Sequence, residues 1–125
     1  MIHEFGARAG RISLNRMVEL LCTNPAKLFG LYPRKGTIAV GSDADIVVFD
    51  PEKTLTITAA NQHSKTDYNL YESTEVTGSP EVVLLRGNVL VEGDQLVAEP
   101  GIGQFVARAK FGQELKPERA TAAAA

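Results

Sequence analysis

Asn24 to Pro51 reads NPAKLFGLYPRKGTIAVGSDADIVVFDP, and this segment is the most informative about the fold. Asn24 is a good helix N-cap, Pro25 suits the first helical position, and Gly30 can close the helix in a left-handed conformation. The apolar run Ile46–Phe49, ended before Pro51, is typical of a strand covered on both faces. The segment therefore predicts a passage from helical to sheet structure.

A first helix is expected just before this segment, from about Ser13 to Cys22. The Ser13 hydroxyl can accept an otherwise unpaired backbone N–H at the start of the helix. Apolar residues follow at the spacing of one helix face, namely Leu14, Met17, Val18 and Leu21. Residues 1–12 are weakly patterned, and Gly6 and Gly10 are expected to break any helix there.

Short strands are expected after the helices. Thr37–Val40 predicts one, and residues 41–43 (GSD) have turn chemistry. Leu55–Ile57, flanked and interrupted by threonines, suits a half-buried strand. The polar stretch 60–73 has no period and predicts a long loop.

A meander is the clearest supersecondary feature of the sequence. Its expected strands are 75–77, 82–86, 89–92 and 95–97. Gly87-Asn88 reads as the two-residue turn of a hairpin, and Gly93-Asp94 reverses the chain again. Residues 99–117 carry glycines around Phe105, Val106 and Phe111, which predicts an extended tail that docks onto another surface. The end, ATAAAA at 120–125, is expected to be disordered.

Composition excludes several classes of function. The 125 residues suit one domain, and 13 basic against 15 acidic residues give a net charge of −2. These charges are scattered, which argues against electrostatic binding to nucleic acid or to a membrane. The single Cys22 excludes an internal disulfide and fits a reducing compartment. No apolar run is long enough to span a bilayer and no secretion signal is visible, so a cytoplasmic location is expected.

A hydrolytic metal site needs three or more ligands on one cavity. The chain has only His3 and His63, with Glu4 beside the first, and the two histidines are 60 positions apart. Surface or interface histidines are therefore the better interpretation. We accordingly predict no metal-binding, cofactor-binding or catalytic residue in this chain.

The other polar groups favour structural roles. Asp43 and Asp45 form a carboxylate pair, but they flank a turn entering a strand, where acids usually bond backbone amides. Cys22 is expected to be a small core residue, with a nucleophilic role as the weaker alternative. Ser42 and Ser73 lack a nucleophile elbow.

Motifs for phosphate and nucleic acid are equally weak. Arg34 and Lys35 could meet a phosphate, although a solvated turn is favoured. Gly-Ile-Gly at 101–103 is too short for a dinucleotide site. Three aromatic residues, Phe5, Tyr68 and Tyr71, do not alternate with a basic stripe as a nucleic-acid platform requires.

The sequence resembles hydantoinases and dihydropyrimidinases. The resemblance is carried by Thr23–Pro51, in which NPAK-x-F-x-LYPRKG precedes GSDAD and the apolar run. It continues through HSKTDYNLYE (63–72), TGSPEVVLLRGNVLVEG (77–93) and GQFVARAKF (103–111). About 100 of the 125 residues are covered, and the best match looks like a bacterial D-hydantoinase. After Glu72 the family usually has glycine, whereas this chain has Ser73.

The resemblance implies a mixed α+β fragment. Its parts would be the terminal helices of a (β/α)8 amidohydrolase barrel at 1–34, the C-terminal half of a β-sandwich composite domain at 35–98, an extended tail at 99–119, and the end 120–125. The family opens hydantoins and dihydropyrimidines with hydroxide held between two zinc ions bridged by a carboxylated lysine. Its ligands, which include a His-x-His pair, belong to the part that precedes this chain's counterpart, so none is carried over.

Three hypotheses remain open from the sequence. The first is an incomplete hydantoinase, a C-terminal fragment from a truncated or split gene that is inactive alone and lacks its N-terminal part. The second is a non-catalytic module that associates with itself or a partner through its sheet edges and tail. In the family, which is homo-oligomeric, the tail packs on a neighbouring subunit. The resemblance makes Phe105, Arg108 and Phe111 the candidates for this contact here, and the alternative is that they cover the chain's own sandwich. The third, ranked last, is a small enzyme using Cys22 or the Asp43/Asp45 pair.

Overall fold

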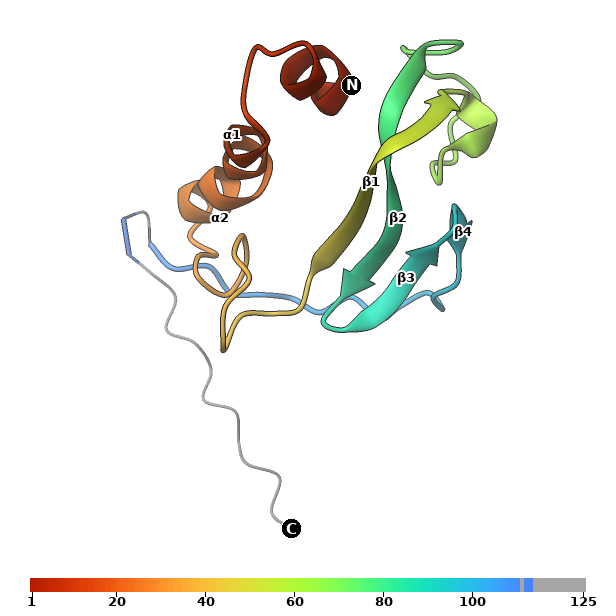
Figure 1. Ribbon diagram of the computed structural model, residues 1–125. Helices are drawn as coiled ribbons and strands as arrows, with labels where there is room; N and C mark the ends of the chain where they lie inside the picture. Colours follow the sequence, from red (N-terminus) through yellow and green to blue (C-terminus); the bar gives the residue numbers. More distant parts are fainter. Residues whose placement is uncertain (111, 114–125) are drawn as a thin grey trace.

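The computed structural model describes residues 1–110, 112 and 113, and it contains a helical arm beside a four-stranded antiparallel sheet (Figure 1). The helical elements are η1 (His3–Arg8), α1 (Leu14–Val18), η2 (Glu19–Thr23), α2 (Asn24–Leu28) and η3 (Ala59–Asn61). The strands are β1 (Ile46–Thr56), β2 (Glu75–Leu85), β3 (Asn88–Glu92) and β4 (Gln95–Leu96). The expected order, helix first and sheet afterwards, is confirmed.

One continuous helix runs through α1, η2 and α2. The predicted cap is confirmed, because the Ser13 hydroxyl accepts the Arg16 N–H at 3.1 Å. The prediction of a separate helix starting at Asn24 is wrong. Thr23 before it is helical, with φ −68° and ψ −47°, and the Asn24 N–H bonds to the Glu19 carbonyl in a wider, π-type turn. A turn of this kind lies directly before Pro25, which has no N–H to donate.

The first residues are ordered, contrary to expectation. η1 passes through Gly6 and ends at Arg8, and Gly10 follows it with a φ of +71°. The space that Gly6 leaves is filled by Ile12, since a Cβ at Gly6 would lie 3.2 Å from the Ile12 side chain. Packing on the sheet, described below, outweighs the low helix propensity of this glycine.

The sheet has the strand order β1-β2-β3-β4. β1 and β2 pair antiparallel from Ile46↔Leu84 to Thr56↔Glu75, so the short strands expected at 55–57 and 75–77 belong to two long ones. The expected stop at Pro51 is wrong, because the register shifts between Asp50 and Thr54 and thereby accommodates a residue that cannot donate.

Both turns of the meander have two residues. The first is Arg86-Gly87, with φ of 48° and 79°, one position earlier than predicted. The second is Gly93-Asp94 as predicted, with φ of 54° and 68°. Positive φ at both central positions matches the twist of a hairpin, and at the first turn the β2–β3 register places the non-glycine Arg86 in this conformation.

The strand expected at 37–40 is absent from the described chain. Ile38 is 83% exposed, Val40 is fully exposed, and no strand in the described part pairs with them. The turn that follows is present, and the Ser42 N–H bonds to the Ala39 carbonyl at 3.1 Å. An apolar alternating segment therefore stays irregular where it has no partner strand.

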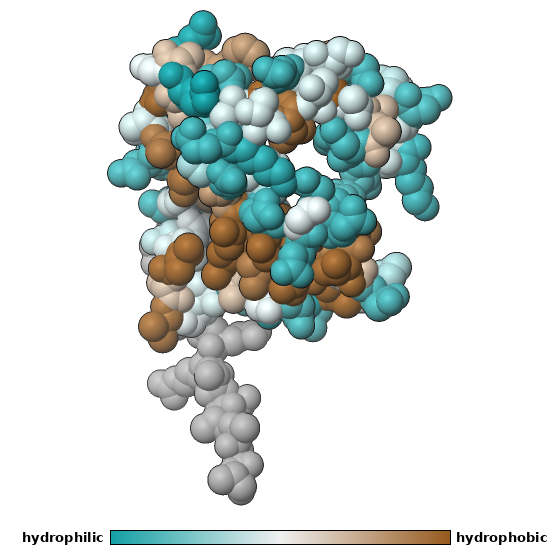
Figure 2. Space-filling model, turned by 45° about the vertical axis from the view of Figure 1, so that its right-hand side comes forward, coloured by the Kyte–Doolittle hydropathy of each residue, from teal (hydrophilic) through white to brown (hydrophobic). Residues whose placement is uncertain are grey.

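Very little of the apolar surface is covered. Among the described residues the buried hydrophobic ones are Ala26, Ile57 and Val76. The predicted helix stripe is open, since Leu14, Val18 and Leu21 are each half exposed, and Cys22 is exposed instead of lying in a core. Val47 and Val48 are 55% and 50% exposed, so β1 is not covered on both faces. Figure 2 shows hydrophobic residues gathered in the lower half of the molecule, where Figure 1 places the β2–β3 hairpin and the start of β1.

The tail lies across its own chain. It runs from β4 beneath the sheet to the end of the helical arm (Figure 1), where the Ala109 N–H bonds to the Gly30 carbonyl at 2.8 Å. Gly30 has φ of +68°, and a side chain there would collide with the Ala109 backbone. Phe105 is 92% exposed, and Arg108 is exposed as well. Phe111 and residues 114–125, including the predicted disordered end, lie outside the described residues.

Ser73 carries a testable backbone cost. Its φ is +63°, the left-handed region that L side chains disfavour by about 1–2 kcal/mol, while its N–H bonds to the Ile57 carbonyl at 2.8 Å. Ser73→Gly keeps this hydrogen bond and removes the backbone strain. The resulting gain in stability is partly offset because glycine makes the unfolded chain more flexible. We expect a gain of about 0.5–1 kcal/mol in the free energy of unfolding by urea denaturation. The matched control Ser64→Gly, in the same loop but without positive φ, is expected to show no gain; an equal gain there would contradict the argument.

Candidate functional site

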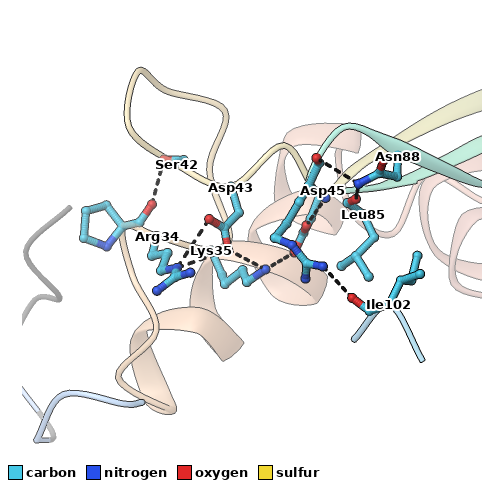
Figure 3. A network of polar contacts seen from close by, with 10 residues as sticks. Arg34, Lys35, Ser42, Asp43, Asp45, Leu85, Asn88 and Ile102 are labelled. Atoms are coloured by element: carbon cyan, nitrogen blue, oxygen red, sulfur yellow. Dashed lines mark hydrogen bonds and ion pairs between the residues drawn. The ribbon is translucent and has the colours of Figure 1, made fainter. Parts of the chain in front are cut away.

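A dense polar cluster joins the end of the helical arm to the start of the sheet (Figure 3). We call the residues Arg34, Lys35, Asp43, Asp45 and Arg86 the ionic clasp. The Arg34 Nε atom lies 3.2 Å from the Asp43 carboxylate, and Lys35 Nζ lies 2.8 Å from the same group. Lys35 also pairs with Asp45. Two carboxylates are therefore held between cations from the preceding loop.

Backbone contacts place the clasp. The Asp43 N–H bonds to the Arg34 carbonyl at 2.9 Å, and the Ser42 hydroxyl donates to the Pro33 carbonyl at 2.7 Å, which closes the loop at its base. On the sheet side, the Arg86 N–H donates to Asp45 at 2.9 Å. The Arg86 guanidinium then donates to the Ile102 carbonyl of the tail. The clasp thus connects loop, hairpin turn and tail at one point.

The charges in the clasp stabilise one another. Burial by itself raises the pKa of Asp43, but hydrogen bonds from Lys35 and Arg34 outweigh it and hold this pKa below its usual value. Burial likewise opposes the charge of Lys35, while the two aspartates raise its pKa above the usual value. Both groups therefore remain ionised around neutral pH.

This arrangement is that of a structural cluster. Asp45 binds a backbone amide, as the turn position indicated, whereas Asp43 binds two cationic side chains instead. Arg34 and Lys35 form ion pairs with these carboxylates. This pairing explains the two cations better than a phosphate-binding role does. A general base needs a carboxylate that can accept a substrate proton, and here strong ion pairs disfavour protonation.

A second polar contact, at the other end of the sheet, was not foreseen from the sequence. His3 is 8% exposed, its Nδ1 atom lies 2.7 Å from the Thr77 carbonyl, and its ring packs edge-on against Phe49 at 5.0 Å. The Thr77 N–H donates to Glu4 at 2.8 Å, and this bond lowers the pKa of Glu4. Gly78, with φ of +97°, leaves room for the imidazole. His3 and Thr77 are 74 positions apart, so no local sequence pattern predicts their contact. Gly78 was the one residue whose type hinted at a close approach there.

The remaining residues singled out by sequence do not converge. His63 is exposed in the loop before β2, far along the chain from His3. In residues 1–110, 112 and 113, no group of three or more His, Cys, Asp or Glu side chains is placed to hold a metal ion. No helix within this part of the chain is long and apolar enough to cross a membrane.

An apolar hollow lies on the helical arm. It has a volume of about 580 Å³ and is lined by Leu20, Asn24, Pro25, Lys27, Leu28, Phe29 and Gly112. Its one ionisable group, Lys27, sits 4.9 Å from the Tyr32 ring centre in a cation–π contact. Apart from Lys27 and Asn24 the lining is apolar, so the hollow has the character of a packing surface.

Comparison with known proteins identifies the family. A family model described as "Amidohydrolase family" matches residues 2–90, which is most of the chain. The chain belongs to the amidohydrolase family. This member is 52% identical to a D-hydantoinase of Geobacillus stearothermophilus over 107 residues, and 43% identical to a dihydropyrimidinase of Rattus norvegicus over 113 residues. These matches cover 86% and 90% of the chain.

Solved structures extend the similarity to three dimensions. A crystal structure of D-hydantoinase superposes with a TM-score of 0.86 at 49% identity, over 90% of this amidohydrolase chain. The alignment takes up 24% of that structure, and the chain spans 23% of the Geobacillus relative. The amidohydrolase chain is thus similar to about a quarter of a hydantoinase.

The clasp predicts a pH dependence of stability. The pKa of Asp43 is lower in the folded chain than its unfolded value near 3.8. Asp43 therefore adds to the free energy of unfolding above pH 3.8, and this addition is lost as the pH falls through the folded pKa. The pKa of Lys35 is higher in the folded chain than its unfolded value of 10.5. Lys35 therefore adds to the free energy of unfolding below pH 10.5, and this addition is lost as the pH rises through the folded pKa.

Asp43→Asn keeps the shape and removes the charge. We expect it to lower the free energy of unfolding by about 1–3 kcal/mol at pH 7 and to flatten the loss of stability below pH 4, measured by urea denaturation across pH. Asp67→Asn, which removes one charge from the loop before β2, is the control and is expected to change little. If Asp43→Asn lost stability below pH 4 as steeply as the original chain does, the role assigned to Asp43 would be contradicted.

Proposed function

We propose that this chain is the C-terminal part of a hydantoinase or dihydropyrimidinase-type hydrolase. The complete protein would open cyclic amides, hydantoins or dihydropyrimidines, by hydrolysis of a ring C–N bond. In this proposal residues 1–34 are the last barrel helices, 35–98 are strands of the sandwich domain, and 99–119 are the tail. The chain supplies structure to that enzyme and is inactive alone.

The observation that carries the proposal is the 52% identity to D-hydantoinase over 107 residues. Identity at this level extends through helix, clasp, sheet and tail, and the same region superposes on a D-hydantoinase structure with a TM-score of 0.86. The similarity is therefore to a continuous piece of a hydantoinase and its conformation.

The metal chemistry expected for the family finds no ligand set in the described residues. The His3 ring is hydrogen-bonded to the Thr77 carbonyl, and His63 lies 60 positions from His3 in the chain. Asp43 and Asp45 form ion pairs with Lys35, and no group of metal ligands forms among the described residues. We therefore assign no step of the reaction to these residues. The zinc ligands would lie in the part of a hydantoinase that this chain does not match.

The open apolar surfaces agree with this assignment. Half-exposed leucine and valine along a helix, and valines exposed on a strand, cost free energy in water unless another surface covers them. The relatives are about four times longer than the matched region. We propose that the rest of the enzyme covers the Leu14–Leu21 stripe and the sheet.

A second possibility is a non-catalytic assembly module. It is favoured by the exposed edge of the sheet and by Phe105 and Arg108, which the docked tail leaves exposed. In this alternative the chain joins copies of itself or a partner, as in a homo-oligomeric family. A stable monomer at dilute and high concentration in light scattering would exclude self-association.

Fragment complementation tests the proposal. The full chain is mixed with the portion of the Geobacillus D-hydantoinase that precedes its matched region, with zinc present, and hydrolysis of hydantoin and dihydrouracil is measured. We expect neither piece alone to be active and the mixture to gain activity.

The control variants probe the helix stripe. Val18→Asp with Leu21→Asp places charge on the proposed contact and should abolish the gained activity, whereas Asn15→Asp with Arg16→Gln, on the polar side of the same helix, should retain it. Activity of this chain alone, or loss of activity in both double variants, would contradict the proposal.

A further inference from the structure

The first half of β2 has one side that no strand of the described sheet covers. β3 pairs with β2 at 82–85, so residues 75–79 pair with β1 on one side and face η1 on the other. Figure 1 shows this N-terminal turn, in red, beside the upper part of β2. Alternate residues of an edge strand turn both backbone groups outward, where they can pair with another chain.

Two side chains of η1 take the place of a neighbouring strand at Thr77. The Glu4 carboxylate accepts the Thr77 N–H at 2.8 Å. The His3 Nδ1 atom lies 2.7 Å from the Thr77 carbonyl, and because a carbonyl can only accept, Nδ1 carries the hydrogen and donates it. An acceptor and a donor therefore supply the two bonds that a residue of an added antiparallel strand would make.

Packing holds these two side chains in place. His3 is 8% exposed, and its ring packs edge-on against Phe49 at 5.0 Å. A Cβ at Gly78 would lie 2.3 Å from the His3 Nδ1 atom, so the absence of a side chain there lets the imidazole reach the strand. Arg8 Nε lies 3.4 Å from the Glu4 carboxylate and supports it from the next turn. The contact is thus built from both η1 and the sheet.

A second copy of the chain fits the side of β2 that η1 covers. In antiparallel pairing with Thr77 opposite Thr77, the two copies exchange both backbone bonds of this residue. The same register sets Glu75 opposite Ser79 and Val76 opposite Gly78, so no like charges meet, and threonine pairs are favourable across strands. Identical chains also associate most readily through such a self-complementary, two-fold contact.

We propose that His3 and Glu4 form an intramolecular cap that keeps the outer side of β2 from pairing with a second copy of the chain. Before it gained its own bonds, a second copy would have to displace two hydrogen bonds, one of them to a carboxylate, and uncover the His3 ring. The chain stays unpaired at Thr77 while the cap is closed and self-associates there when it is open. This inference goes beyond the proposed hydrolase and rests on contacts within this chain.

Amide exchange of the full chain, followed by NMR, tests whether the cap is closed. His3→Ala with Glu4→Ala removes both partners of Thr77, so in dilute solution the Thr77 amide should exchange at least about tenfold faster. The Ile57 amide, which bonds to the Thr74 carbonyl at 2.9 Å beside the β1–β2 pairing, should keep its rate. An unchanged Thr77 rate would overturn the proposal.

Matched variants separate the cap from general destabilisation. His63→Ala with Glu99→Ala removes the same residue types at exposed positions and should change neither rate. If the first double variant also frees Ile57, the milder Glu4→Gln decides. It keeps the side-chain shape and weakens a charge-assisted bond, so Thr77 should exchange roughly two- to fivefold faster with Ile57 unchanged. An equal acceleration of both amides in Glu4→Gln would overturn the proposal.

Sedimentation of the same chains over a range of concentration tests what the cap excludes. The dissociation constant of the dimer should be at least about tenfold lower for His3→Ala with Glu4→Ala than for the original chain or the His63/Glu99 control. The Thr77 amide of this variant should become slow again at high concentration, because it then bonds to the second copy. Equal dissociation constants in all three chains, or a dimer that protects 46–49 and leaves Thr77 fast, would overturn the proposal.

Discussion

The antiparallel ladder between β1 and β2 is the interaction on which the rest of the structure depends. It joins two strands of eleven residues each, Ile46–Thr56 and Glu75–Leu85, and it is the longest pairing in the described chain. Every other part is attached to one of its ends. At one end η1 docks on Thr77, and at the other the clasp ties the preceding loop and the tail to the hairpin turn.

These two attachments replace a closed core. Few apolar side chains of the described residues are buried, whereas buried His3 lies where η1 meets β2, and Asp43 of the clasp is largely shielded. Hydrogen bonds and ion pairs therefore fix the arrangement of helix and sheet, while apolar surface remains open for another body. Because a hydrogen bond contributes only about 1 kcal/mol net, such an arrangement gains greatly from any surface that covers it.

The accuracy of the sequence-based predictions followed the range of the interactions involved. The Ser13 cap, the helix stripe, the Gly93-Asp94 turn and the long loop depend on neighbours within a few positions, and the structure contains them. The helix start at Asn24 and the strand at 37–40 were wrong, although their local patterns were good. A π-type turn carried the helix through Pro25, and 37–40 had no strand to pair with. The role of Asp43 was only partly foreseen, since its cationic partners come from the preceding loop.

Local patterns were enough to predict the order of helix and sheet, most turn positions and, through NPAK, PRKG and GSDAD, the family resemblance that the comparisons later confirmed. These features depend on local periodicity and turn chemistry, which involve only residues close together in the chain. The tertiary structure was needed to show that His3 and Glu4 bond to Thr77, that Arg86 links Asp45 to the tail, and that β1 has one unpaired edge in the described sheet. The reason is physical: hydrogen bonds between residues tens of positions apart depend on how whole strands align, and no local pattern records that alignment.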